Sequence, residues 1–188
     1  MYGMINKAME EMVVKHHGEK VWNRIKREAK LEVEVFISTD PYDDRITYDL
    51  VAAAARVLGV AVDDLLVGFG EHWILVTASE GYGGLMHAAG TTFIEFLEHL
   101  PHFHDRVRMV FPYLSPPRFE LSNVDAERGF LELHYFSHRP GLAYFVVGLM
   151  QGLGKMFGTP VLVTHVEMRQ SAEDHDVFRV EWDPAIKE

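Results

Sequence analysis

The sequence contains no cysteine among its 188 residues. Disulfides, thiolate metal ligands and covalent cofactor attachment through cysteine are therefore excluded. No apolar run reaches the roughly 18 residues that a membrane span needs, and the first residues lack the basic and apolar segments of a secretory signal. We expect a cytoplasmic protein that holds any metal or cofactor non-covalently, through histidine, oxygen or methionine ligands.

Basic residues are also scarce, with 18 Lys and Arg against 28 Asp and Glu and a net charge of -10. A surface with this charge repels phosphate backbones and anionic lipids. Nucleic acids and membranes are therefore not expected as partners. Hydrophobic residues make up 48% of the chain and aromatic residues 12%, which suits one domain with one substantial core.

Hydrophobic periodicity predicts an α+β fold in a single domain over residues 1–188. The first 80 residues have helical spacing throughout. From residue 81 a glycine-rich break at 81–84 precedes a helical stretch, and prolines end that stretch. The expected elements are helices at 4–17, 20–29, 47–58, 62–78, 91–111 and 142–157, and strands at 118–123, 130–137, 161–168 and 177–182. The second half therefore ends in a β-β-α-β-β order, with an antiparallel sheet.

His104 lies on the apolar face of the helix expected at 91–111, four residues after Leu100 and three before Val107. A lone histidine on such a face is usually a core residue bonded to a carbonyl group, so its position alone does not make it a ligand. Pro101 kinks the helix or starts a new one. His104 points inward in either case, because Phe103 and Val107 belong to the same segment.

The segment Tyr135-Phe136-Ser137-His138-Arg139 closes the second expected strand. Period-two alternation puts Tyr135, Ser137 and Arg139 on one face, with two hydroxyl groups and a guanidinium. Such a row suits a ligand with paired carboxylates, because arginine offers a bidentate fork and the hydroxyls donate to the remaining oxygens. The alternative is a solvated strand face with one surface arginine.

The combination of motifs resembles the H-NOX family, haem-binding domains that also form the sensor of soluble guanylate cyclases. The motifs that carry the resemblance run along almost the whole chain: Met1-Tyr2-Gly3, Phe69-Gly70-Glu71-His72-Trp73, Phe103-His104-Asp105-Arg106-Val107, Pro116-Pro117, Tyr135-x-Ser137-x-Arg139, Gly148-Leu149 and Glu173-Asp174-His175-Asp176. The departure from the family pattern is Pro101.

The resemblance implies a non-covalent haem b between the helical half, about residues 1–80, and the sheet half, about residues 81–188. His104 would be the sole protein ligand of the ferrous iron. Tyr135, Ser137 and Arg139 would bind the propionates, and Pro117 would press on the haem and bend it.

The helix after the signature indicates which gas is bound. Bound oxygen needs a hydrogen-bond donor, which oxygen-binding members of the family supply from a tyrosine at this place. Here Phe145 shares the apolar stripe with Leu149, whereas Tyr144 aligns with Gln151 and Lys155. Counting back from Gly148-Leu149 by the family pattern also puts Phe145 at the distal position.

The rest of the expected distal wall is Ile5, Met9, Trp73 and Thr77, although each is equally compatible with plain core packing. The Trp73 indole is the remaining donor that could support an oxygen ligand. We therefore predict selectivity for nitric oxide, with carbon monoxide also bound.

The resemblance further implies a sensor rather than an enzyme. Nitric oxide would break the iron–His104 bond, the haem would relax against Pro117, and the released helix and hairpin would form a two-state element. The chain ends soon after the last strand, with no kinase or cyclase segment. We therefore expect a separate signalling protein as partner, such as a histidine kinase or a diguanylate cyclase or phosphodiesterase.

Three alternatives remain at this point. One is an oxygen-binding haem protein of the same fold. Another is a carrier for a fatty acid or bilin, which would use Arg139 but give His104 no role. The third is a zinc-dependent hydrolase built from His99, His102, His104 and Asp105 with His134 or His138. It lacks a His-Glu-x-x-His motif, and His102 and His104 lie on different helix faces.

Overall fold

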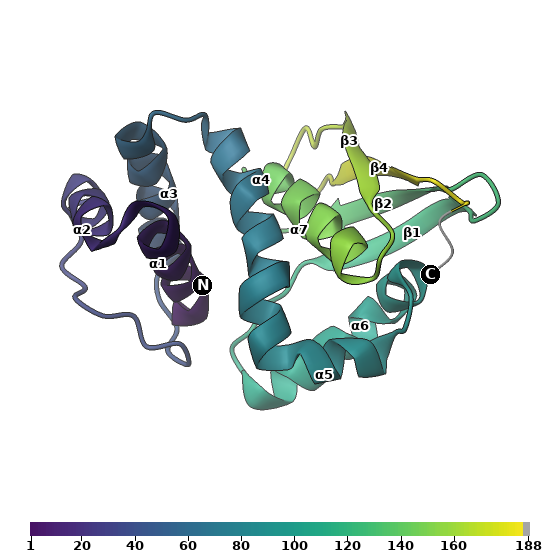
Figure 1. Cartoon of the computed structure of the whole chain (residues 1–188), viewed down its shortest axis with the longest axis horizontal. Coiled ribbons are helices and arrows are strands. Elements are labelled where there is room, and N and C mark those ends of the chain that lie inside the picture. Colours follow the sequence, from purple (N-terminus) through teal and green to yellow (C-terminus); the bar gives the residue numbers. More distant parts are fainter. Residues whose placement is uncertain (186–188) are drawn as a thin grey trace. The chain divides into compact units, whose positions relative to one another are not determined.

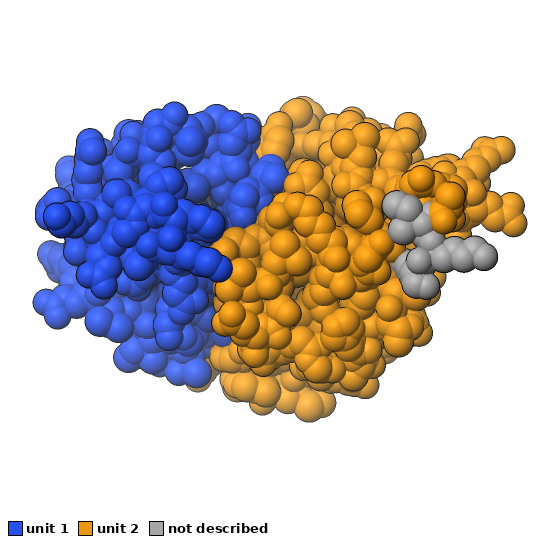
Figure 2. Space-filling model, in the orientation of Figure 1, with its two compact units in different colours: residues 1–69 blue, residues 70–188 orange. Residues whose placement is uncertain are grey.

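Residues 1–185 are described by a computed structural model, in which helices precede a four-stranded sheet (Figure 1). The chain divides into two compact units, unit 1 over Met1–Phe69 and unit 2 from Gly70 onward (Figure 2). The boundary falls inside helix α4 (Val62–His72). Among the helices of residues 1–185, none combines the length and the apolar character that crossing a membrane requires.

Unit 1 is helical, as the periodicity predicts. It contains α1 (Gly3–His17), α2 (Glu19–Glu28), α3 (Asp44–Leu58) and most of α4. Helix α3 begins where the Asp43 side chain accepts from the Arg45 amide and ends at Gly59, which has a left-handed conformation at φ 70°. The fully buried large side chains of the unit are Met9, Val13, Ile25 and Leu50.

Unit 2 opens with a continuous helical stretch. Helix α4 passes into the π-helix η1 (Trp73–Ala78) and then into α5 (Ser79–Ala89). The helix break predicted at 81–84 is wrong. Each glycine costs a helix about 1 kcal/mol relative to alanine, but packing offsets this cost, because Tyr82 contacts Phe111 edge-on and Met86 is buried.

Helix α6 (Phe93–Val110) carries His104. The Thr92 hydroxyl accepts from the Glu95 amide, and the Glu95 carboxylate accepts from the Thr91 amide, so the two side chains together cap the helix start. The helix continues through Pro101. Its buried residues are Phe93, Phe96, Leu97 and Leu100. Val110, the last residue of the helix, is 68% exposed.

The sheet has the strand order β1-β2-β4-β3 and is antiparallel throughout. Its strands are β1 (Arg118–Asp125), β2 (Phe130–Phe136), β3 (Val161–Glu167) and β4 (Asp176–Trp182). Helix α7 (Ala143–Met156) contacts β3 and β4 on one sheet face (Figure 1). The predicted α+β class and β-β-α-β-β order are confirmed.

Alternation along β2 separates the two sheet faces. Leu131, Leu133 and Tyr135 are buried, whereas Glu132, His134 and Phe136 between them are only half-buried. Neighbouring residues of β2 therefore point to opposite faces of the sheet, with Tyr135 on the buried face and His134 on the other.

Candidate functional site

His104 differs from an ordinary structural histidine. His99, on the same helix, donates from Nδ1 to the Ala89 carbonyl oxygen at 2.8 Å. The half-buried His104 instead contacts the rings of Phe103 and Phe119, with centroids 6.0 and 6.3 Å away. Within residues 1–185 its ring nitrogens make no hydrogen bond. The bond to a carbonyl group is made by the exposed His99, so the alternative of a core histidine bonded to a carbonyl group does not describe His104.

Burial, together with the smaller effect of the positive charge of Arg108, lowers the pKa of His104 to about 4, although the negative charge of Asp105 partly opposes the shift. The imidazole is therefore neutral at pH 7. A neutral imidazole presents a nitrogen lone pair, which is the form that binds a metal ion. His104 thus has the charge state and the unbonded nitrogens that a metal ligand needs.

Tyr135 is the buried end of the Tyr-x-Ser-x-Arg signature. It is 4% exposed and packs against Phe119 and Phe178 at 5.4 and 6.4 Å between ring centroids. Burial raises the pKa of Tyr135, although a hydrogen bond with the Ser137 side chain partly offsets the rise. The phenol therefore keeps its proton at neutral pH and can donate a hydrogen bond.

Ser137 and Arg139 lie beyond the end of β2, so the strand predicted at 130–137 is one residue too long and its alternation extends only to Tyr135. The Arg139 amide donates to Ser137 Oγ at 3.1 Å. The Arg139 guanidinium donates from Nη1 to the Ser115 carbonyl oxygen at 2.9 Å. The signature is thereby connected to the segment that contains the half-buried Pro117.

Two residues of this region, Phe119 and Arg169, are not among the site residues predicted from the sequence. Phe119 lies opposite Tyr135 in the β1–β2 register and also contacts His104. Alternation along the strand predicted at 118–123 could have identified it. Arg169 donates from Nη1 to the Ser137 carbonyl oxygen at 2.6 Å, and its other guanidinium nitrogens reach the carbonyl groups of Ser171 and Ala172. No spacing rule distinguishes Arg169 within its polar loop.

Helix α7 differs in part from the prediction. Its most buried large residues are Val146, Val147, Met150 and Leu153, because one side of the helix covers the sheet. Phe145 and Leu149 are half-buried. Tyr144, which aligns with Gln151 and Lys155 in the sequence, is half-buried as well. Its ring lies edge-on to His165 of β3 at 6.3 Å.

The π-helix η1 packs against α7 and carries two polar side chains named from the sequence. Trp73 is half-buried. The Thr77 hydroxyl is buried and has no hydrogen-bond partner among residues 1–185, whereas a helical threonine commonly bonds back to a carbonyl of the preceding turn. Short π-helical segments are frequent at functional sites. Thr77 is therefore a buried donor without an acceptor.

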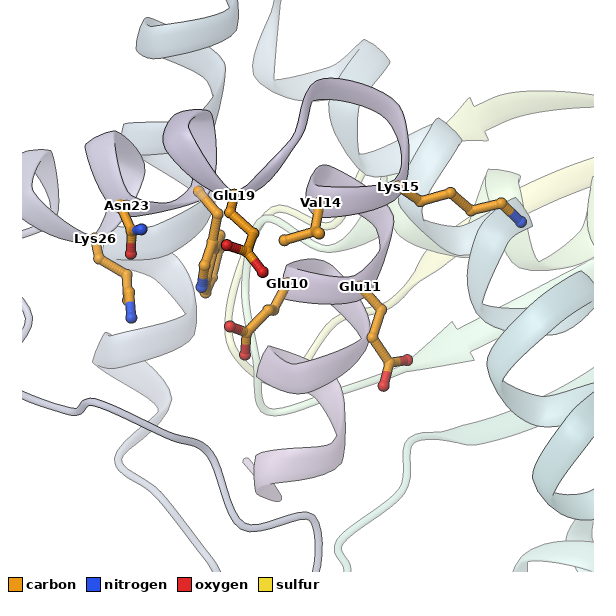
Figure 3. A pocket seen from close by; sticks show the side chains of 8 residues that line it. Glu10, Glu11, Val14, Lys15, Glu19, Asn23 and Lys26 are labelled. Carbon is orange, nitrogen blue, oxygen red and sulfur yellow. The ribbon is translucent and has the colours of Figure 1, made fainter.

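Ile5 and Met9 belong to α1 of unit 1, where Ile5 is half-buried and Met9 is fully buried. Their part in ligand binding remains a prediction from the sequence. An open hollow on α1 and α2 is lined mainly by Glu10, Glu11 and Glu19 with Lys15 and Lys26 (Figure 3). None of the predicted site residues lines this charged hollow.

The zinc-hydrolase alternative lacks a ligand set. Within residues 1–185 no group of three or more histidine or carboxylate side chains gathers in a way that could hold a metal ion. His99 is bonded to Ala89, and His102 is exposed.

Fold and site together define an α+β domain with a neutral, half-buried histidine on one helix and a Tyr-x-Ser-x-Arg signature at the end of a strand. The family model described as Haem-NO-binding matches residues 2–165. The chain therefore belongs to the haem-NO-binding, or H-NOX, family, whose domains sense gases such as nitric oxide and oxygen through haem. An H-NOX domain is a sensor and is not itself catalytic.

Curated relatives are soluble guanylate cyclases. Gcy-31 of Caenorhabditis elegans is 25% identical over 182 residues, covering 96% of this chain and 26% of that protein. Cyclase 89Db of Drosophila melanogaster is 24% identical over 157 residues, covering 84% of this chain and 23% of that protein. The chain thus spans about a quarter of the length of these relatives.

Solved H-NOX structures share the fold. The unliganded Fe(II) protein from K. algicida superposes with a TM-score of 0.85 at 24% identity, covering 97% of both chains. The Fe(II)NO protein from S. oneidensis superposes with a TM-score of 0.84 at 22% identity, covering 97% of this chain and 99% of that one.

Proposed function

We propose that this protein is a haem-based sensor selective for nitric oxide, with His104 as the iron ligand and residues 1–188 as one haem-binding domain in the cytoplasm. Haem b would supply a ferrous iron that binds nitric oxide, and also carbon monoxide. The observation that carries the proposal is the neutral imidazole of His104, whose nitrogens make no hydrogen bond within the described chain. Its contact with Phe119 keeps it beside the Tyr135 signature.

Tyr135, Ser137 and Arg139 would hold the haem carboxylates. The raised pKa of Tyr135 supports this role, because a protonated phenol donates to a carboxylate oxygen. Arg139 adds a permanent positive charge and a bidentate fork. The bond from Arg139 to Ser115 supports a link between the residues that would bind the carboxylates and Pro117, which would press on the haem.

The side chains of α7 support selectivity for nitric oxide. Tyr144, the tyrosine of this helix, contacts His165, while Phe145 and Leu149 are apolar and half-buried. Bound oxygen carries partial negative charge and needs a donor, whereas nitric oxide binds ferrous haem without one. Trp73 would add bulk to this wall. Ile5 and Met9 are included on the resemblance alone.

One observation favours oxygen binding as a second candidate function. The Thr77 hydroxyl is buried without an acceptor, and a donor of this kind could bond to an oxygen ligand. An unmet buried donor costs about 1–3 kcal/mol. A ligand that accepts its proton would recover that cost.

The signal would begin at His104. Release of His104 from the iron would leave α6 held by its other contacts, which include those with β1 and α5. Helix α6 and the β1–β2 hairpin would then form the two-state element that a partner reads. The partner would be a separate histidine kinase, diguanylate cyclase or phosphodiesterase, or a cyclase region like that of the relatives.

A gas titration tests this proposal. Ferrous haem-loaded protein should form no stable oxygen complex in air-equilibrated buffer, yet bind nitric oxide stoichiometrically, as followed by the Soret band. A long-lived oxygen complex would reassign the protein to the second candidate function.

A further inference from the structure

Two histidines face each other on the side of the sheet away from Tyr135. His134 lies on β2 between the buried Leu133 and Tyr135, and His175 immediately precedes β4. His134 Nδ1 and His175 Nε2 are 2.9 Å apart, and both residues are half-buried. All of these residues belong to unit 2, and neither histidine takes part in the proposed haem site.

The outer nitrogen of each histidine has its own polar partner. Ser122 Oγ lies 2.7 Å from His134 Nε2, and Asp174 Oδ1 lies 3.6 Å from His175 Nδ1. The Ser122 hydroxyl is within hydrogen-bond distance of His134 and can accept a proton from Nε2. Asp174 is too distant for a hydrogen bond to the His175 ring and attracts a proton on Nδ1 through its charge alone. The two inner nitrogens share a hydrogen bond, in which one donates its proton to the lone pair of the other. A metal ion bound to both nitrogens would take the place of that proton, which would move to an outer nitrogen or to solvent. Metal-binding histidines are typically oriented by a partner on the other ring nitrogen.

We propose that His134 and His175 together bind a divalent late transition-metal ion such as Zn²⁺, Ni²⁺ or Cu²⁺. Imidazole suits this group of metals. Two imidazole nitrogens bound to one tetrahedral zinc ion at about 2.0–2.1 Å stand about 3.3 Å apart. The observed distance of 2.9 Å is that of a hydrogen bond. Metal binding therefore requires the two nitrogens to separate by a few tenths of an ångström and both rings to turn toward the ion.

The surroundings hold the pair in place. The ring of Phe136 stacks on His175, with centroids 4.2 Å apart and planes tilted by 16°. The guanidinium of Arg118 lies over Phe136 at 3.7 Å from its centroid. The chain also carries a net charge of -10, which favours cations near its surface.

The site supplies two protein ligands, since no third histidine or carboxylate of residues 1–185 completes a metal-binding group. Water would fill the other positions. We therefore expect reversible binding of one ion per chain, which depends on both histidines and is independent of haem.

Calorimetric titration of Zn²⁺ into the full-length, haem-loaded protein tests the proposal. Zinc is redox-inert, so the iron keeps its oxidation state. His134→Gln and His175→Gln should each weaken zinc binding by more than about tenfold, which is the smallest loss typical of removing only an outer partner. The matched control is His102→Gln, an exposed histidine of α6, which should change the affinity less than about twofold. The Soret band should stay unchanged in all variants, which separates this test from that of the haem site.

A measurement on the unmodified protein avoids any dependence on how the variants fold. In ¹⁵N-labelled protein, the imidazole signals of His134 and His175 should shift together with one equivalent of Zn²⁺, while those of His102 stay in place. The proposal is overturned if no zinc binds, if both glutamine variants bind zinc as tightly as the parent, or if the shifts occur at other histidines.

Discussion

The guanidinium of Arg139 donates a hydrogen bond to the carbonyl oxygen of Ser115, 2.9 Å away. Ser115 immediately precedes Pro116 and Pro117, whereas Arg139 closes the Tyr-x-Ser-x-Arg signature. The resemblance implies separate roles for these two segments, one in gripping the haem carboxylates and the other in bending the haem. Because this hydrogen bond joins the two segments, we expect a movement of the haem carboxylates to displace the proline segment as well.

Replacing Arg139 by alanine should lower haem affinity about tenfold to a hundredfold. The physical reason is the loss of a charged hydrogen bond worth about 1.5–3 kcal/mol, which leaves a propionate poorly paired. Haem transfer to an apoprotein acceptor measures this loss. Arg179→Ala is the control, because Arg179 is half exposed and lies 3.8 Å from Glu132. Equal transfer rates in both variants would mean that the signature is an ordinary surface segment.

Arg169→Gln should destabilise the haem-free protein by about 1–3 kcal/mol, because the carbonyl groups of Ser137, Ser171 and Ala172 lose their charged donor. It should also weaken haem binding less than Arg139→Ala does, because Arg169 acts through the Ser137 backbone. Urea unfolding and haem transfer measure the two effects. A variant as stable as the parent would show that the loop does not depend on Arg169.

Phe145→Tyr should improve oxygen binding about tenfold to a hundredfold, because one hydrogen bond to a partly charged ligand in a dry pocket contributes about 1.5–3 kcal/mol. Tyr144→Phe should change little, since the Tyr144 ring contacts His165. Oxygen titration of the ferrous variants provides the measurement. Loss of a stable oxygen complex on Tyr144→Phe would show that the distal assignment is wrong by one residue.

Thr77→Val should stabilise the haem-free protein by about 1 kcal/mol, because the isosteric methyl group removes a buried hydroxyl that has no partner. Nitric oxide affinity should stay unchanged, and any residual oxygen affinity should fall. Urea unfolding and gas titration of the same preparation measure the three quantities. Clear destabilisation would contradict this account, because it would mean that the hydroxyl is bonded.

Much of the fold follows from local periodicity. The four strands and their antiparallel order, as well as α1, α2, α3 and α7, are predictable because each buries a face with its own repeat. The continuous helix through Gly81 and Gly84 is not, since what offsets the glycines is the contact of Tyr82 with the distant Phe111 and the burial of Met86. Tertiary packing of this kind has no local signal.

The candidate site is likewise predictable from local patterns only in part. The inward direction of His104 follows from its helix, and the position of Tyr135 follows from its strand. Ser137 and Arg139 lie past the strand end, where alternation no longer applies. The bond from Arg169 to Ser137 joins residues 32 positions apart. Neither relationship leaves a pattern in neighbouring residues.

The most direct test of the central claim is haem binding by His104→Gly, with His102→Gly as the control for a glycine on the same helix. His104→Gly should fail to retain haem and should regain it when imidazole is added, because small imidazole can occupy the space left by the missing side chain. His102→Gly should bind haem as the parent does. If His104→Gly binds haem with an unchanged Soret band and needs no imidazole, His104 is not the iron ligand.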